Sequence, residues 1–204
     1  TRNAGTMSTS PGGSNLYNLD YISSGTINTG PEFHSNDTRV DNVEMNGGGT
    51  VTLNADRTIN GNMILSSGDF NIGTNILTLE GNLVANSSST LTGGTVVFDG
   101  NTTISGSAVP TFGNIQVNNT RSLTFPSGDF DVAGNILFEA GATINSGTGT
   151  LLLSGGATQI ISAGGASISN IRVDKTSGAD VELTSQLVIT GALRVVSANS
   201  NFAS

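Results

Sequence analysis

The stretch FGNIQVNNTRSLTFPSGDFDVAGNILF, residues 112–138, contains the repeating pattern of this 204-residue chain. Its apolar residues come in pairs two positions apart, such as Ile115 with Val117 and Phe130 with Val132. That spacing predicts short β-strands with one buried face, because alternate side chains of a strand point to opposite sides. Between the pairs lie short polar segments rich in Gly, Asn, Asp and Ser, which favour turns.

The same plan occurs in two further copies. VDNVEMNGGGTVTLNADRTINGNMIL starts at Val40, and ISNIRVDKTSGADVELTSQLVITGALRV starts at Ile168. Each copy has X-Asn before its first apolar pair and a glycine before its third pair. These glycines are Gly61, Gly134 and Gly191. The repeat covers roughly residues 40–195, with spacings that vary by several residues.

A shorter phrase recurs almost unchanged. SGDFNIGTNIL at residues 67–77 and SGDFDVAGNIL at residues 127–137 share seven of eleven positions. We interpret Phe70 and Phe130 as inward-facing residues and Ser-Gly-Asp as a corner. There Asp would accept backbone N–H bonds and Gly would adopt an unusual dihedral. The phrase therefore indicates a repeated structural unit, not a repeated chemical site.

Every third apolar pair is separated by about 19 to 21 residues along the sequence, as from Val51 to Phe70 and from Leu123 to Ala142. This spacing favours a three-sided coil. We expect an all-β chain folded as a parallel β-helix, or β-solenoid, with about 20 residues per coil. About eight coils would form a rod of roughly 40 Å, because stacked strands lie near 4.8 Å apart. Tandem β-sandwiches are the alternative, but they need longer strands and larger aromatics, and the chain has no tryptophan.

The repeat also divides the chain. Residues 1–38 lack it, and we expect them to form an N-terminal cap or a linker. Residues 39–204 form the repetitive solenoid, which we expect to continue beyond this fragment of a secreted protein.

Composition argues against several classes of protein. The formal charge is −8, with seven Lys plus Arg against fifteen Asp plus Glu, and there is no cysteine. The basic residues are scattered singly, so no positive stripe is available for nucleic acid or for an anionic membrane surface. The lack of cysteine excludes disulfides and cysteine-ligated zinc. No apolar run approaches the roughly 18 residues of a membrane span.

The phrases GGTVVFDG, FGNIQVNN and GGGTVTLNADRTINGNMIL resemble the tandem repeats of large secreted surface proteins of Bacteroidota. These include gliding adhesins and other cargo of the type IX secretion system. The resemblance covers roughly residues 40–204 and rests on low-complexity patterns, not on a catalytic motif. It implies a non-enzymatic structural or adhesive module at the outer cell surface. As a rod or multivalent adhesin, it would bind surface glycans or other cell-surface proteins weakly and at many sites.

Two alternatives remain open on the same fold. A carbohydrate-binding or polysaccharide-degrading β-helix would need several acids and an Arg or Lys on one face. The pairs Asp129/Asp131 and Asp180/Glu182 each share a strand direction, but neither has a basic residue in its own segment. A self-assembling filament subunit would instead associate through exposed strand edges at its end coils.

The sequence predicts no catalytic and no cofactor-binding residue. His34, the sole histidine, stands beside two aspartates in a loop, where a solvated side chain is the simpler interpretation. Calcium is the cofactor that the excess of acids leaves open, with Asp69, Asp129 and Asp131 as candidate ligands. No EF-hand loop and no Gly-Gly-X-Gly-X-Asp array accompanies them.

Overall fold

The computed structural model describes residues 1–2, 11–12, 15–33, 39–176, 179–196 and 202–203. These residues form 24 strands and no helix, and the pairings between the strands are parallel. The chain winds as a β-solenoid of about eight turns, with equivalent residues about 21 positions apart. The parallel solenoid predicted from the sequence is confirmed, and the alternative of tandem sandwiches is wrong.

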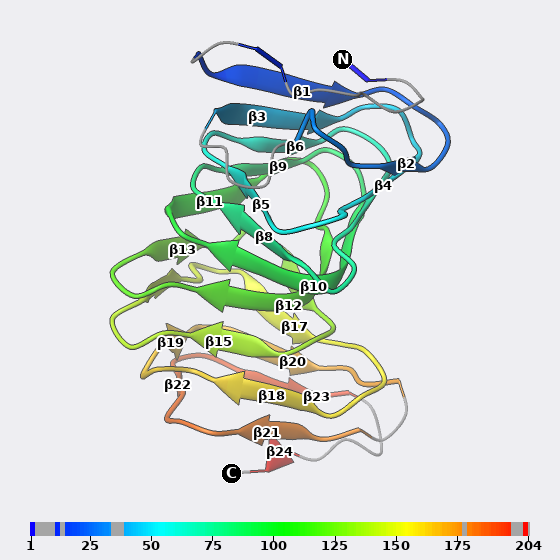
Figure 1. Cartoon of the computed structure of the whole chain (residues 1–204). Coiled ribbons are helices and arrows are strands. Elements are labelled where there is room, and N and C mark those ends of the chain that lie inside the picture. The colour runs from blue at the N-terminus through cyan, green and yellow to red at the C-terminus, as the bar shows by residue number, and fades with distance from the viewer. Residues whose placement is uncertain (3–10, 13–14, 34–38, 177–178, 197–201, 204) are drawn as a thin grey trace.

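Three faces make up the stack of turns (Figure 1). The first face consists of β1 (Tyr17–Tyr21), β3 (Val40–Met45), β6 (Met63–Leu65), β9 (Leu83–Ala85), β11 (Asn101–Ser105), β13 (Ser122–Thr124) and β16 (Thr143–Asn145), followed by β19 (Ser167–Ile168) and β22 (Val188–Ile189). The second face consists of β2 (Ile27–Asn28), β4 (Thr50–Thr52), β7 (Asp69–Asn71), β10 (Thr90–Phe98), β12 (Thr111–Val117), β14 (Asp129–Val132), β17 (Thr150–Leu153), β20 (Asn170–Val173) and β23 (Leu193–Val195). The third face consists of β5 (Arg57–Ile59), β8 (Ile76–Leu79), β15 (Ile136–Phe138), β18 (Gln159–Ser162), β21 (Val181–Leu183) and β24 (Phe202–Ala203).

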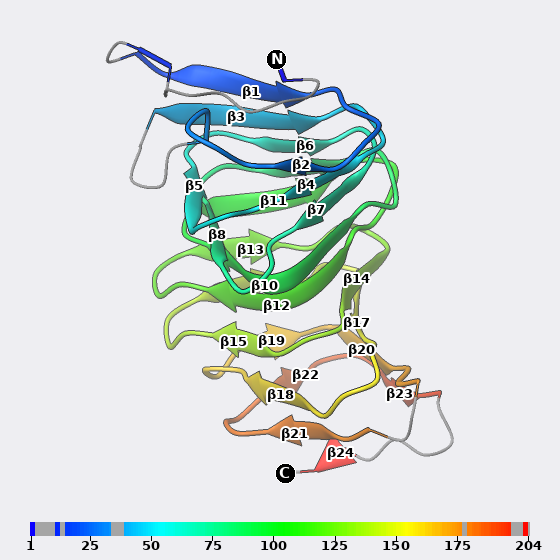
Figure 2. The same cartoon turned by 45° about the vertical axis from the view of Figure 1, so that its right-hand side comes forward.

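The second and third faces share two long strands. The first half of β10 pairs with β7 and its second half with β8, so one strand continues around a corner. β12 does the same with β14 and β15. Figure 2 shows the strands of successive turns stacked from β1 at one end to β24 at the other. The two faces therefore form one continuous hydrogen-bonded sheet.

The core is built from columns of inward-facing side chains, one residue per turn. On the second face the Cα partners follow one another as Ile27, Val51, Phe70, Leu91, Phe112, Val132, Leu153, Val173 and Val195. All are buried except the last, which is 47% exposed. Complete burial of one such side chain stabilises the fold by about 1.5–3 kcal/mol.

Large aromatic side chains gather at one level of this core. The ring centroids of Phe112 and Phe130 are 5.0 Å apart, and those of Phe125 and Phe130 are 4.5 Å apart. Phe98 approaches Phe112 edge-on at 6.0 Å. The inward placement predicted for Phe70 and Phe130 is confirmed, because both are completely buried.

The two copies of Ser-Gly-Asp-Phe do not occupy equivalent positions. Phe70 stands in the same column as Val132, and Phe130 lies two residues earlier on its strand. An even shift keeps both phenylalanines on the inner side, because side-chain direction alternates with a period of two. Gly68 has the positive φ that we expected, +85°, whereas Gly128 is not among the glycines with positive φ.

The first turn begins earlier than the repeat pattern indicates. β1 pairs with β3 and β2 pairs with β4, so both sheets start inside the segment 1–38 that the sequence assigns to a cap or linker. Further along the chain, Leu123 pairs with Ile144, two positions beyond the expected Ala142. The second difference arises because the number of residues in the corners varies from turn to turn.

A ladder of asparagine side chains joins the turns along the first face. In each step a backbone N–H donates to the side-chain oxygen of the asparagine one turn earlier, over 2.7–3.1 Å. The series runs through Asn18, Asn42, Asn62, Asn82 and Thr103. Each step supplies an acceptor within the protein for one backbone donor.

A second asparagine ladder lies at the corner before the third face. The Asn114 side-chain oxygen accepts from the N–H of Asn135 over 2.8 Å, and the Asn135 oxygen accepts from the N–H of Ile160 over 2.8 Å. A Cβ atom at Gly134 would lie only 2.6 Å from the Asn114 oxygen. The asparagine of each X-Asn therefore packs against the repeated glycine of the next turn, where a larger residue would not fit.

Candidate functional site

The candidate calcium ligands Asp69, Asp129 and Asp131 lie on the outer side of the second face, on β7 and β14. An Asp69 carboxylate oxygen accepts both the N–H and the hydroxyl of Thr90, each over 2.8 Å. Asp131 accepts the hydroxyl of Thr111 over 2.9 Å. The expectation that Asp69 accepts a backbone N–H is correct, although the donor belongs to the next turn and not to its own corner.

The register of the sheet separates the carboxylates of Asp69 and Asp131. Thr90 and Thr111 stand between Asp69 and Asp131 in one outward-facing column. In the described part of the chain, no group of three or more His, Asp or Glu side chains could hold a metal ion. Calcium binding by the three acids stays a prediction. His34 lies outside the described residues.

Asp129 contacts a basic residue from a distant segment. The Arg172 guanidinium nitrogen Nη2 lies 2.8 Å from Asp129 Oδ2. Arg172 belongs to β20, two turns beyond β14, because β14 pairs with β17 and β17 with β20. The repeat length contains a signal for this contact: two steps of about 21 residues lead from Asp129 through Thr150 to Asn170, next but one to Arg172.

This ion pair is half-exposed, with 31% of the Arg172 side chain and 38% of the Asp129 side chain accessible. Pairs with such exposure contribute about 0–1 kcal/mol to stability. Beside it, Arg172 Nε and Asp131 Oδ1 are buried and have no hydrogen-bond partner. The acid pair Asp129/Asp131 and Arg172 thus form one polar cluster on the second face. We name it the Asp129–Arg172 cluster.

A shallow hollow adjoins this cluster. Arg194, one turn further along, is the direct Cα partner of Arg172 in the β20–β23 ladder. Thr150 and Asn170 line the hollow together with both arginines, and its volume is about 180 Å³. The hollow therefore presents two guanidinium groups beside a hydroxyl and an amide.

The other acid pair has different surroundings. Glu182 lies on β21 of the third face, where its register partners are Ile160 and Ala203. Among the described residues, neither Asp180 nor Glu182 forms an ion pair. Among the described residues, the pair Asp129/Asp131 therefore has Arg172 beside it, whereas the pair Asp180/Glu182 has no basic partner.

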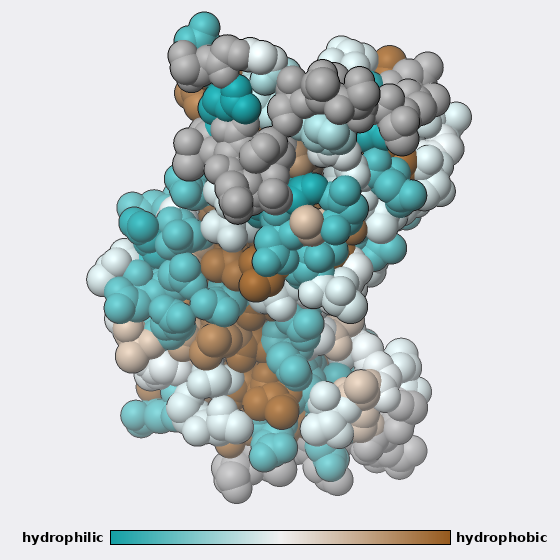
Figure 3. Space-filling view, viewed as in Figure 1, coloured by the Kyte–Doolittle hydropathy of each residue, from teal (hydrophilic) through white to brown (hydrophobic). Residues whose placement is uncertain are grey.

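A larger groove, of about 420 Å³, lies on the outer side of the third face. Its lining includes Asn114, Gln116, Asn135, Leu137, Ile160 and Ser162. Figure 3 shows apolar side chains along the middle of this face, with hydrophilic residues on both sides. Ile160 is 41% exposed, so the groove combines accessible hydrocarbon with amide and hydroxyl groups.

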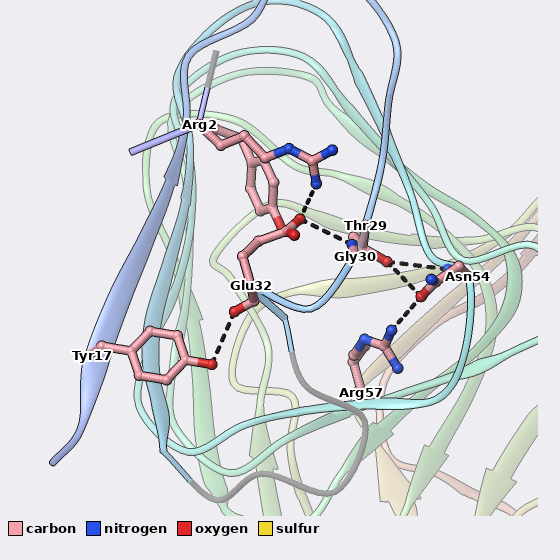
Figure 4. A network of polar contacts seen from close by, with 8 residues as sticks. Arg2, Tyr17, Thr29, Gly30, Glu32, Asn54 and Arg57 are labelled. Atoms are coloured by element: carbon pink, nitrogen blue, oxygen red, sulfur yellow. Dashed lines mark hydrogen bonds and ion pairs between the residues drawn. The ribbon is translucent and has the colours of Figure 1, made fainter. Parts of the chain in front are cut away.

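The N-terminal turn contains a buried polar network (Figure 4). Arg2 forms an ion pair with Glu32, whose carboxylate also accepts the N–H of Gly30 over 3.1 Å and the hydroxyl of Tyr21 over 3.2 Å. Burial and the Glu32 charge raise the pKa of Tyr21 far above its usual range. Arg2 also bridges to Tyr21 through the backbone. We interpret this network as the closure of the first turn.

Asn54 connects the neighbouring corner to the same network. Its side-chain oxygen accepts the Thr29 hydroxyl over 3.0 Å and also a guanidinium N–H of Arg57. The guanidinium carbon of Arg57 lies 5.8 Å from the ring centroid of Phe33. Burial lowers the pKa of Arg57.

Lys175, the single lysine of the sequence, is buried. Its ammonium donates to the Ser154 carbonyl over 2.6 Å and to the Gln159 side-chain oxygen over 3.2 Å. Burial lowers the pKa of Lys175. The Gln159 amide in turn donates to the carbonyl of Val132 over 3.0 Å. These bonds fasten the corner between the second and third faces, so we assign Lys175 a structural role.

No family model, no curated protein and no solved structure matches the chain. In the part that the structure describes, no helix is long and apolar enough to cross a membrane.

Proposed function

We propose that the chain is a structural and adhesive module of a secreted bacterial cell-surface protein, acting as a rod or a multivalent adhesin without enzymatic activity. The observation that carries the proposal is the continuous stack of parallel turns, each packed on its neighbours. Such a stack gains stability turn by turn, so it suits a spacer that carries binding surfaces. The resemblance of its repeats to those of secreted Bacteroidota proteins supports the same role.

The expected partners are surface glycans or other cell-surface proteins. Around the third-face groove, the side-chain oxygen of Gln116 and the side-chain nitrogen of Asn135 offer hydrogen bonds to sugar hydroxyls, because the other polar atoms of these amides are bonded within the protein. Leu137 and Ile160 offer hydrocarbon. None of the residues that line the groove is aromatic, so a sugar ring finds no surface to stack on. We therefore expect weak single contacts, with avidity from many copies.

Adhesion at different surface densities tests this role. Beads coated densely and sparsely with the purified chain are allowed to settle on immobilised polysaccharide films. Retention that rises much more steeply than the number of chains per bead supports multivalent adhesion. Retention in simple proportion to density, or none at any density, contradicts it.

Polysaccharide degradation is the second candidate function, and the Asp129–Arg172 cluster is the observation that favours it. In that role Asp129 and Asp131 would supply acid and base, and Arg172 would hold a sugar carboxylate. The release of reducing or unsaturated ends from a polysaccharide, lost in Asp129→Asn, would establish this activity.

Self-association is the third candidate, favoured by the last turn. Leu193 and Val195 are 44% and 47% exposed, whereas their register partners on the preceding turn, Ile171 and Val173, are buried. Sedimentation over a range of protein concentrations distinguishes a filament subunit, whose mass grows with concentration, from a monomeric rod.

A further inference from the structure

The second face carries two arginines at directly opposed positions. Arg172 and Arg194 are Cα partners on adjacent turns. Like charges at such positions repel each other and destabilise a sheet. The chain has only seven Lys plus Arg and a formal charge of −8, so this adjacency is not the result of a generally basic surface. An anion between the two side chains would remove the repulsion.

Arg194 differs from other basic side chains in having no polar partner within the described part of the chain. Arg2 pairs with Glu32, and Arg121 pairs with Asp99 over 3.1 Å. Among the described residues, Arg194 forms neither an ion pair nor a side-chain hydrogen bond. Its guanidinium is therefore available to a ligand.

Arg172 is already oriented for the same ligand. Its Nη2 is held by Asp129 over 2.8 Å, while nearly a third of the side chain remains exposed. The hollow of about 180 Å³ between the arginines also includes Thr150 and Asn170. A guanidinium presents parallel N–H donors whose geometry matches the two oxygens of a carboxylate.

We propose that this hollow binds the carboxylate of a uronate unit in an acidic polysaccharide, between Arg172 and Arg194. The volume suits one sugar-sized group, and the hollow is open to solvent. Asp129 lies beside the site, as the ion-pair partner of Arg172 and the register partner of Thr150, so a group with one negative charge is favoured over a dianion such as sulfate. The proposal rests on the adhesive role and names its ligand class.

Affinity electrophoresis tests the site with polygalacturonate in the gel and dextran as the neutral polymer. We expect polygalacturonate to retard the wild-type chain. Arg194→Gln should weaken this binding about tenfold, as expected for the loss of a charge-assisted hydrogen-bonded contact. The matched control is Arg121→Gln, which removes the same charge from an arginine paired with Asp99 and should leave the affinity within twofold. Free galacturonate should compete better than inorganic sulfate at equal ionic strength.

The contrary results of this experiment distinguish a failure of the uronate site from a failure of the adhesive function. An unchanged affinity in Arg194→Gln, an equal loss in Arg121→Gln, or equal competition by sulfate overturns the uronate site. Retardation by dextran alone, or bead adhesion without retardation by polygalacturonate, overturns the site and leaves the adhesive role standing. Failure to bind any polymer or film contradicts both.

Discussion

The side-chain oxygen of Asn114 lies 2.8 Å from the backbone nitrogen of Asn135, one turn further along the solenoid. The Asn114 amide nitrogen donates to the Gly94 carbonyl of the preceding turn over 3.1 Å. One side chain therefore connects three consecutive turns at a corner. This contact is independent of the apolar core and can be tested separately from it.

Removal of this side chain should weaken the stack. Asn114→Ala deletes one donor and one acceptor to backbone groups, so we expect the free energy of unfolding to fall by about 1–2 kcal/mol. Urea denaturation measures the change. Asn119→Ala is the control, because Asn119 is exposed and its side chain has no hydrogen bond among the described residues. Equal losses in the two variants would contradict a role for the ladder.

The aromatic level of the core should be the most sensitive to truncation. Phe112 is completely buried between Phe98 and Phe130. Phe112→Ala should lower the free energy of unfolding by about 3–5 kcal/mol, because it leaves a cavity among large neighbours. Phe112→Leu retains most of the volume and should cost less than about 1.5 kcal/mol. Similar urea midpoints for the two variants would show that this level is loosely packed.

Thr120 is a position where glycine should stabilise the chain. It is the described non-glycine residue with positive φ, +63°, in the turn before β13. A β-branched residue pays a steric penalty of about 1–2 kcal/mol in this conformation, so Thr120→Gly should raise the thermal midpoint. Thr124→Gly, within β13, should instead lower it, because glycine weakens a regular strand. A fall in both variants would contradict the strained turn.

Stability should decline at alkaline pH because of Tyr21. Burial and Glu32 raise the pKa of this phenol above its ordinary value of 10.0. Above about pH 10 the unfolded chain releases the proton that the folded chain retains, so the free energy of unfolding falls as pH rises. The decline per group approaches about 1.4 kcal/mol per pH unit.

Tyr21→Phe removes the titrating group and should make this decline shallower. Urea unfolding of the wild type and of Tyr21→Phe, from about pH 8 to about pH 11, measures the difference. The variant loses the hydroxyl bond to Glu32 at every pH, so the comparison concerns the slopes. Parallel curves would show that Tyr21 ionises in the folded chain as it does in the unfolded one.

The sequence is sufficient to predict the parallel solenoid and its inner side. Apolar pairs such as Ile115 with Val117 alternate with a period of two, and burial follows that period. The exact register is not predictable in the same way. Partners on adjacent turns lie as close in sequence as Val51 and Phe70 and as far apart as Ile136 and Ile161. The spacing varies because the corners differ in length, and corner length depends on turn geometry that the apolar pattern does not reveal.

The polar contacts are harder to predict from the sequence, because they depend on the same register. Asp129 meets Arg172 only after two turns, and an error of one or two residues per turn places a different side chain beside it. The repeated X-Asn is visible in the sequence, but its role depends on the backbone N–H of the following turn. That donor becomes a neighbour of Asn114 only through the fold.

Incubation of the purified chain with a panel of surface and algal polysaccharides, with pull-down and the release of new ends measured in one experiment, tests the proposed role as a non-enzymatic module. We expect binding without reducing or unsaturated ends above those of the Asp129→Asn variant. New ends that persist through repeated purification and disappear in Asp129→Asn would contradict that role and make the Asp129–Arg172 cluster an active site.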